Sequence, residues 1–372
     1  MKSILKVIML IVLTAILPAN AAIKKDADSS SHSAIRTVKD TVGFATNVEQ
    51  IEKIVALSLD AENEHIAANA QKYDLSPQTN YIAGVSPHDD YLTAGPVYAH
   101  LYPYIKAKRV VIFGVAHYAA HRKVDNKLIF DSFKSWTGPY GPAPVSDVRE
   151  RVLKHLSPES VLVSDAMQAE EHSVEALIPW LQHFNRDVEI VSILVPHMRF
   201  SKMDSLAAEL AIACESIITE NNWQLGKDIA FLISNDGSHY GDQGWGGKNY
   251  APFGAGCEGL IKASERDILL AKETLCGELS TEKSHEFYDH VLQPGDYYTY
   301  QMTWCGRFAV PFGCDFLSHL AHKLGRKSFA GDFLRYNNSV SIGELDARDL
   351  GLGLTTSVSL HHWVGWLAIG YR

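Results

Sequence analysis

The sequence predicts an α/β fold: a single large domain in which helices flank a central, mixed but mostly parallel sheet. Short apolar stretches with the length of strands alternate along the chain with longer amphipathic stretches. Residues 188–195 are almost continuously apolar, which is typical of a strand that helices cover on both faces. Strands that alternate with helices imply βαβ units and a mostly parallel sheet. The chain of 372 residues is long enough to bury a large core.

Each expected element follows from its own pattern. We expect strands at the short apolar stretches 81–85, 109–115, 127–130, 161–164, 188–195, 228–234, 328–336 and 364–371. We expect helices at the longer, periodic stretches 47–70, 93–105, 147–156, 173–184, 201–220, 258–276, 282–289 and 312–324. The last two strands can add antiparallel edges to the sheet. Residues 241–259 are rich in glycine and aromatic residues and predict a long loop, which is either functional or a mobile surface excursion.

The first residues have the pattern of an export signal. Lys2 and Lys6 supply a positive start, residues 7–17 form an apolar run, and an Ala-Asn-Ala pattern at 19–21 fits a cleavage site. The alternative is an N-terminal membrane anchor, but the run is shorter than the roughly 20 apolar residues that a bilayer span needs. No other stretch is apolar enough to cross a membrane, so we expect no span in the mature chain.

These features predict three parts of the chain. Residues 1–21 are expected to be a signal peptide, and residues 22–46 a polar N-terminal arm that is a tether or is poorly ordered. Residues 47–372 are expected to form the α/β domain. A cleaved signal would make the protein periplasmic or secreted.

Charge and cysteine usage limit the partners and the redox chemistry. The formal net charge is −9 and there is no basic stripe, so no nucleic-acid partner is expected. In an exported chain disulfides can form, but five cysteines are an odd number and at least one must stay unpaired. The absence of a C-x-x-C pair argues against a thioredoxin-like motif or a zinc ribbon.

Histidines follow two of the predicted strands directly. His88 lies in Ser-Pro-His-Asp-Asp-Tyr after the first strand, and His117 lies in Gly-Val-Ala-His-Tyr after the second. The carboxyl ends of strands in an open α/β sheet meet at the rim where ligands bind. Either histidine alone could simply be hydrogen-bonded in a loop. Two in the same setting predict a shared metal pocket, because imidazole is a common ligand for zinc, copper and iron.

Two further strings carry acidic residues beside histidines. Asp236 and His239, in Ser-Asn-Asp-Gly-Ser-His, follow another predicted strand. They could be direct metal ligands, groups that hold ligand imidazoles, or a general acid–base pair. The alternative is a capping aspartate with an exposed histidine. Glu171 and His172, in Glu-Glu-His-Ser-Val-Glu, open a predicted helix, where acidic residues suit the helix dipole. The functional alternative places one of this second pair in the pocket.

Cys305 is a candidate third ligand. It lies in Trp-Cys-Gly-Arg, where Arg307 would make the thiol more acidic. The alternatives are a buried thiol or a disulfide with Cys314. A thiolate would complete a His-His-Cys set with His88 and His117, which suits Fe(II), Cu(I) or zinc.

Five strings in order between about residues 81 and 315 resemble the motifs of the MEMO family, also known as AmmeMemoRadiSam system protein B. Ser-Pro-His-Asp-Asp-Tyr is similar to the family's Ala-Pro-His-Ala-Gly-Tyr, and Gly-Val-Ala-His to its Gly-Pro-Ser-His. Glu-Glu-His-Ser-Val-Glu is similar to Asp-Glu-His-Ser-Ile-Glu, and Ser-Asn-Asp-Gly-Ser-His-Tyr-Gly to Ser-Ser-Asp-Phe-x-His-Trp-Gly. Cys-Gly-Arg is shared. One departure is Asp89-Asp90, which replaces an Ala-Gly pair and adds two charges near the pocket.

The resemblance implies a fold like that of the class III extradiol dioxygenases, which use non-haem Fe(II). It also implies that a metal, Fe(II) or copper with zinc as a further candidate, binds to His88, His117 and Cys305. Asp236 and His239 would line the same pocket. His239 is expected to act as the acid–base in catalysis, and Asp236 would orient it or balance its charge. His172 and Glu171 are the other residues expected to take part in catalysis.

We therefore expect an exported, metal-dependent redox enzyme that acts on a small-molecule or peptide ligand. One alternative is a non-catalytic protein that binds copper, another metal or a peptide. A second alternative is a zinc hydrolase, which a thiolate ligand disfavours because such enzymes use histidine and carboxylate ligands.

Overall fold

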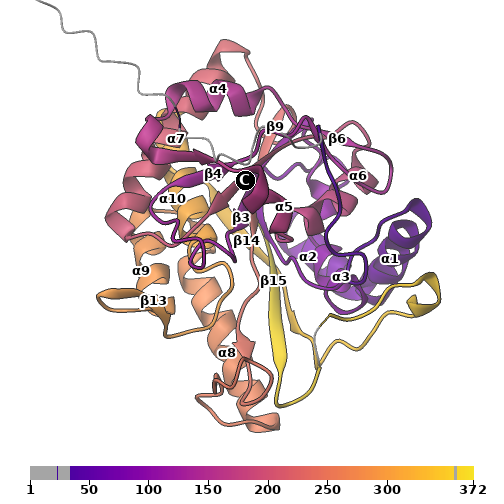
Figure 1. Cartoon of the computed structure of the whole chain (residues 1–372). Coiled ribbons are helices and arrows are strands. Elements are labelled where there is room, and N and C mark those ends of the chain that lie inside the picture. The colour runs from indigo at the N-terminus through magenta and orange to yellow at the C-terminus, as the bar shows by residue number, and fades with distance from the viewer. Residues whose placement is uncertain (1–22, 24–33, 356–357) are drawn as a thin grey trace, which may run out of the picture.

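The computed structural model describes residue 23 and residues 34–355 and 358–372. The predicted signal peptide at 1–21 lies outside these residues. The parts described form an α/β fold built on one large mixed sheet, which confirms the predicted fold class (Figure 1).

Four parallel strands occupy the centre of the ten-stranded sheet. They are, in spatial order, β2 (Ala83–Ser86), β9 (Ile229–Ser234), β3 (Arg109–Val115) and β8 (Glu189–Val195). Because β9 lies between β2 and β3, the loops that follow these three strands leave the sheet side by side. This order decides which side chains meet at the rim.

The remaining strands of the sheet extend it on both sides. Beyond β8, β4 (Leu128–Phe130) is antiparallel and β7 (Val161–Val163) is parallel to β4. Beyond β2 come the antiparallel strands β15 (Trp363–Tyr371), β14 (Ala330–Asn338) and β11 (Gly277–Glu278). The short strand β10 (His239–Tyr240) pairs with the first residues of β15. The last two long strands are thus antiparallel, as expected, although β15 lies inside the sheet rather than at its edge.

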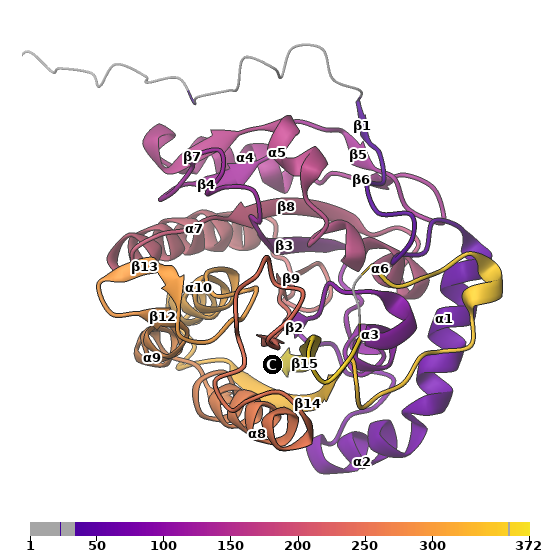
Figure 2. The same cartoon turned by 60° about the horizontal axis from the view of Figure 1, so that its bottom comes forward.

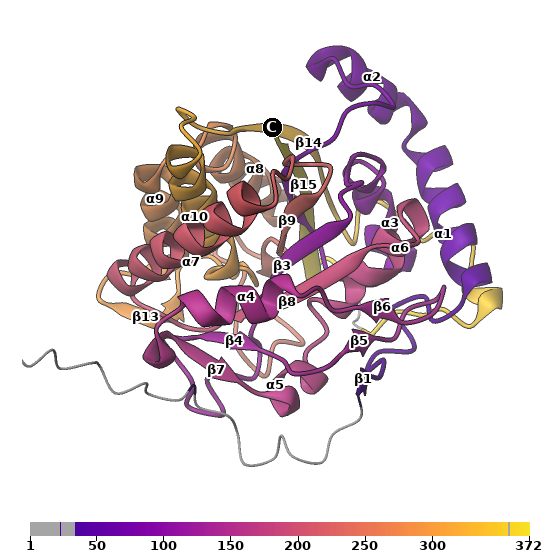
Figure 3. The same cartoon turned by 90° about the horizontal axis from the view of Figure 1, so that it is seen from above.

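Helices cover both faces of the sheet (Figures 2 and 3). One face carries α7 (Phe200–Glu220), α8 (Cys257–Thr274), α9 (Thr281–Val291) and α10 (Ala309–Lys323), with α4 (Val148–His155) packed on α7. The other carries α1 (Val48–Ala61), α2 (Asn63–Tyr73), α3 (Tyr91–Tyr98) and α6 (Ile178–Phe184). Alternation along β3 divides the core: Val111 and Phe113 belong to one buried cluster, and Val110 and Ile112 to the other.

The predicted elements are present with shifted boundaries. The helix expected at 47–70 is two helices that meet at Glu62, whose buried carboxylate binds Arg335 and His100. The helix expected at 173–184 becomes regular only at α6, with Pro179 in its first turn, where a missing N–H costs nothing. The short helix α5 (Asp165–Glu170) was not expected. Residues 241–255 form a long loop between β10 and α8.

Residues 34–46 differ from the expected polar arm. Within them, β1 (Ile35–Arg36) pairs with β5 (Ser135–Trp136), which also pairs with β6 (Ala143–Pro144). Arg36 and Phe44 are each only 2% exposed. This part of the chain packs onto the domain because its few large side chains find partners there that the local sequence does not reveal.

Two further expectations concern the described residues. Within them, no helix combines the length and apolarity that crossing a bilayer requires. All five cysteines carry free thiols, including Cys305 and Cys314.

A hairpin of β12 (Leu292–Gln293) and β13 (Asp296–Tyr300) leads into the segment that holds Cys305.

Candidate metal centre

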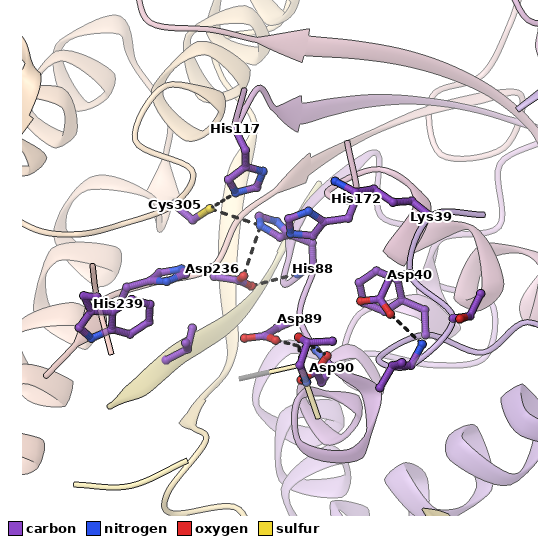
Figure 4. Close-up of a pocket in the computed structure, with 16 residues that line it drawn as sticks. Lys39, Asp40, His88, Asp89, Asp90, His117, His172, Asp236, His239 and Cys305 are labelled. Atoms are coloured by element: carbon purple, nitrogen blue, oxygen red, sulfur yellow. Dashed lines mark hydrogen bonds and ion pairs between the residues drawn. The ribbon is translucent and has the colours of Figure 1, made fainter. Parts of the chain in front are cut away.

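Three neighbouring strands deliver the first candidate residues. His88 follows β2, Asp236 follows β9 and His117 follows β3, each two residues beyond the strand. Because these strands are parallel and adjacent, the three side chains meet at the carboxyl rim of the sheet, as the sequence predicts for the histidines (Figure 4).

Hydrogen bonding determines which nitrogen of His88 is free. The Ser234 hydroxyl donates to the Ser173 carbonyl at 2.6 Å, so it accepts from His88 Nδ1 at 2.8 Å. The proton of a neutral imidazole is then on Nδ1, and Nε2 keeps its lone pair. His88 Nε2 lies 3.4 Å from Cys305 Sγ. A metal-binding histidine needs this arrangement, in which one ring nitrogen is held by a hydrogen bond and the other keeps a free lone pair.

His117 is oriented in the same manner by a carboxylate. Its Nδ1 donates to Glu171 at 2.7 Å, and its backbone N–H donates to the other oxygen of Glu171 at 2.9 Å. The lone pair on His117 Nε2 therefore faces Cys305 Sγ at 2.7 Å. A histidine held by a carboxylate behind it is the usual arrangement of a metal-binding imidazole.

Cys305 reaches the rim from the segment before α10. Its backbone N–H donates to the Asp236 carbonyl, and the N–H of Gly306 donates to the Asn235 side chain at 3.0 Å. A Cβ at Gly306 would lie 2.4 Å from Asn235 Oδ1, so only glycine allows this approach. Contacts between two distant segments thus place the thiol.

The donor atoms of His88, His117 and Cys305 all lie within 4.8 Å of one another. A single ion with bonds of about 2.0–2.3 Å can bridge donors at such separations after small adjustments. Two imidazole lone pairs and a thiol therefore fit one transition-metal ion. Burial, followed by Asp236 and Glu171, raises the pKa of the Cys305 thiol. This differs from the expected acidification by Arg307, so an ion would have to supply the charge that stabilises the thiolate.

Glu171 lies behind His117. It is 1% exposed, and in addition to His117 it accepts from the backbone N–H groups of His172 and Ser173. Burial raises its pKa, but His117 and these donors outweigh burial, and the net pKa is lowered. The segment 170–175 does not open a helix as expected: α5 ends at Glu170 and Glu171 is extended. This break turns the carboxylate toward His117.

Asp236 contacts His88 rather than His239. Its Oδ1 accepts from the backbone N–H of His88 at 3.0 Å, and its Oδ2 lies 3.3 Å from His88 Nε2. Burial, followed by the charge of Asp89, raises the pKa of Asp236. The geometry therefore assigns Asp236 to positioning the first histidine, and the expected pairing with His239 is not formed.

His172 and His239 lie on either side of the three donors. The His172 ring stacks on His117 with centroids 4.6 Å apart, and burial, with the charge of His117, lowers its pKa to about 4. His239 packs edge-on against Trp245, and its buried Nε2 has no partner among the described residues. Burial lowers the pKa of His239 to about 3. Both rings are neutral at pH 7.

A pocket of about 510 Å³ opens onto these groups. Beside the predicted residues His88, His117, His172, Asp236, His239 and Cys305, it is lined by Lys39, Asp40, Thr41, Val42, Phe44, Asp89, Asp90, Trp245, Thr355 and Val364. The segment around residues 39–44 was expected to be outside the domain. Trp245 comes from the glycine-rich loop, so one end of that loop belongs to the pocket wall.

Comparison with known proteins agrees with this geometry. A family model described as "Memo-like protein" matches residues 58–349. A MEMO1 family protein of Pyrobaculum arsenaticum is 32% identical over 166 residues, which cover 43% of this chain and 53% of that protein. A MEMO1 family protein of Saccharolobus islandicus is 30% identical over 179 residues, covering 46% and 57%. The chain thus spans little more than half the length of these curated relatives.

A solved structure was also matched. The crystal structure of the uncharacterized protein JW3007 from Escherichia coli K12 has 13% identity, covers 70% of this chain and 86% of that one, and gives a TM-score of 0.28. A score this low carries no argument about fold or function.

Proposed function

This chain belongs to the Memo-like protein family, and we propose that it is an exported, metal-dependent redox enzyme whose ligands are His88, His117 and Cys305. One observation carries the proposal: two imidazoles with hydrogen-bonded Nδ1 atoms direct their Nε2 lone pairs at a single buried thiol. The N-terminal sequence pattern supports export, to the periplasm or the exterior.

The donor set limits the metal. Two imidazoles and a thiolate suit Fe(II), Cu(I) or zinc. Iron or copper, when bound, would supply one-electron exchange with a substrate or an oxidant. Glu171 would hold His117 in the binding tautomer, and Ser234 would do the same for His88, whose backbone N–H Asp236 accepts.

The rest of the pocket suits a small organic molecule or the end of a peptide. Phe44 and Trp245 offer aromatic surface, and the His239 ring, whose Nε2 has no partner among the described residues, would act as the acid–base. Asp89 and Asp90, which depart from the family pattern, place carboxyl groups on the wall. The pocket would therefore suit a ligand that donates hydrogen bonds to these carboxyl oxygens.

The zinc hydrolase alternative needs a carboxylate ligand. Donor atoms of His117, Glu171 and His172 do lie within 4.8 Å of one another. However, the Glu171 oxygens already accept from His117 and from the backbone of His172 and Ser173. This engagement favours Glu171 as an orienting group. The other group in this pocket that includes a carboxylate, Asp236, His239 and Cys305, contains the thiol as well.

The test is metal analysis of untagged protein from the periplasmic fraction of expressing cells, prepared anaerobically without added metal. We expect about one iron or copper ion per chain, and an N-terminus at Ala22. The variants His88→Ala, His117→Ala and Cys305→Ser should each lose most of the metal. His361→Ala and Cys257→Ser, at exposed positions, are the matched controls and should retain it.

Oxygen consumption by the metal-loaded protein separates an enzyme from a protein that only binds metal or peptide. Turnover of a catechol or thiol substrate, lost in the Cys305→Ser variant, is the expected result. Full metal content in all three ligand variants would overturn the site. Metal binding without turnover of any such substrate would support the non-catalytic alternative.

A further inference from the structure

Two packed helices bring a second group of metal-binding side chains together, outside the candidate metal centre. Asp204 belongs to α7, and Asp315 and His319 lie one turn apart on α10, which packs on α7 (Figures 2 and 3). Donor atoms of the three residues lie within 4.8 Å of one another. None of them lines the large pocket, or the small cavity of about 70 Å³ that His117 and Cys305 also line.

The imidazole of His319 is the middle donor of this group. Its Nε2 lies 2.8 Å from Asp204 Oδ1 and 3.8 Å from Asp315 Oδ1. A tetrahedral ion with bonds of about 2.0–2.2 Å separates its ligand atoms by about 3.4 Å. The two observed separations lie on either side of this value, so small side-chain rotations would place all three donors around one ion.

Asp315 is a buried carboxylate with few partners. Its side chain is 0% exposed, its Oδ1 accepts from the Thr281 hydroxyl at 2.6 Å, and its Oδ2 has no hydrogen-bond partner among the described residues. No lysine or arginine in that part of the chain forms an ion pair with it. Native structures pair nearly all their buried polar groups, and buried charges are paired or bind metals. The carboxyl group, which lies toward His319, therefore calls for a cation at this position.

The group is open to solvent on one side. The side chain of Asp204 is 43% exposed and that of His319 is 26% exposed, with Asp315 at the base. An ion can therefore enter without unfolding of the helices and can keep a water molecule as its fourth ligand. Thr281, the first residue of α9, holds Asp315 from behind, as hydrogen-bonding groups behind metal ligands do.

The donor atoms determine the class of ion. An imidazole nitrogen favours transition metals over calcium and magnesium, which prefer oxygen ligands throughout. The group contains no thiol, so it lacks the preference for soft ions such as Cu(I) that Cys305 gives the candidate metal centre. Two carboxylates balance the charge of a divalent ion.

We propose that Asp204, Asp315 and His319 bind a divalent transition-metal ion such as zinc, and that this ion joins α7 to α10. The ion replaces the hydrogen bond between His319 Nε2 and Asp204, and the proton of the neutral ring is then on Nδ1. Because α10 begins shortly after Cys305, the ion also fixes the helix that continues from the thiol segment. The site does not depend on the metal of the proposed function.

Zinc is the probe. The full chain with His88→Ala and Cys305→Ser, which disable the candidate metal centre, is stripped of metal and titrated with zinc by calorimetry. We expect about one zinc ion per chain, with an anomalous diffraction peak between α7 and α10. His319→Gln or Asp204→Asn, added to this protein, should each weaken the affinity on the order of tenfold or more, because one of three protein ligands is lost.

His290→Gln is the matched control. His290 also lies four residues from a carboxylate on its own helix, with Nε2 4.0 Å from Glu286, but it belongs to none of the three-residue groups of the described chain. Its replacement should leave the zinc affinity unchanged, and a loss there would place the ion on α9 and overturn the proposal. No zinc binding by the starting protein would also overturn it, as would unchanged affinity in a His319→Gln protein with native circular dichroism.

Discussion

The two cavities that meet at His117 and Cys305 carry different ionisable groups. The large pocket carries the carboxyl groups of Asp40, Asp89, Asp90 and Asp236 and the amine of Lys39, and burial raises the pKa of Asp89, Asp90 and Asp236. The small cavity carries the guanidinium of Arg307 and no carboxyl group among its lining residues. A thiol and an imidazole are all that the two walls share.

The difference shows how one pair of residues can serve ligands of two kinds. The large pocket presents carboxyl oxygens, which accept hydrogen bonds from a ligand, while the small cavity presents the guanidinium of Arg307, which can only donate. If the comparison is correct, changing the charge of one wall should leave the properties of the other unchanged.

The largest expected effect concerns the shared wall. Glu171→Gln keeps the shape of the side chain but removes the charge that fixes His117 Nδ1–H. Metal affinity, measured by competition with a chelator, should fall about 10- to 100-fold, as is typical when a carboxylate behind a ligand histidine is lost. Glu170→Gln is the control, since the neighbouring Glu170 pairs with Arg122 near the surface instead. Equal loss in both variants would contradict a specific role for Glu171.

A smaller effect should appear in the large pocket alone. Burial, followed by Asp89, raises the pKa of Asp90 to about 7, so its protonated form is favoured in the folded state. The stability that this contributes is complete below about pH 4 and is lost as the pH rises through 7. Asp90→Asn should therefore gain on the order of 2 kcal/mol of unfolding free energy relative to the parent between pH 5 and pH 8.

Urea denaturation of metal-free protein at the two pH values measures this change. Asp349→Asn, at an exposed carboxyl group, should show no comparable dependence. A difference between Asp90→Asn and the parent that is the same at both pH values would refute the assignment.

The smallest expected effect is on the chemistry of Cys305. Because burial and the nearby carboxylates raise its pKa, alkylation of metal-free protein should be slow at pH 7 and accelerate above pH 9. Iodoacetamide should react a few-fold faster relative to iodoacetate at Cys305 than at the exposed Cys257, because the wall repels the anionic reagent. Peptide mass spectrometry reads both sites in one sample. Asp89→Asn should lower the ratio of the iodoacetamide rate to the iodoacetate rate at Cys305. If this ratio is the same at Cys305 and Cys257 in the parent protein, the pocket wall does not repel anions.

Much of the site was predictable because strand ends are local features. His88, His117 and Asp236 each follow an apolar stretch, and the periodicity locates those stretches to within a few residues. His197 has the same Pro-His signal as His88 and could have been found by it. The sequence could not have predicted the pocket residues Lys39, Phe44 and Trp245. Their segments carry no regular pattern and reach the pocket only through contacts with distant parts of the chain.

The amino-acid pattern alone establishes an α/β sheet with histidines at its strand ends, because burial of alternating apolar stretches dictates both. The order of the strands is a tertiary property. Only the placement of β9 beside β2 brings Asp236 to His88. Likewise, only packing decides that no carboxylate of the described residues pairs with Arg307 and that four carboxyl groups line the large pocket. The interaction between two charged groups depends on the distance between them in space and on their burial, and a local stretch of sequence determines neither.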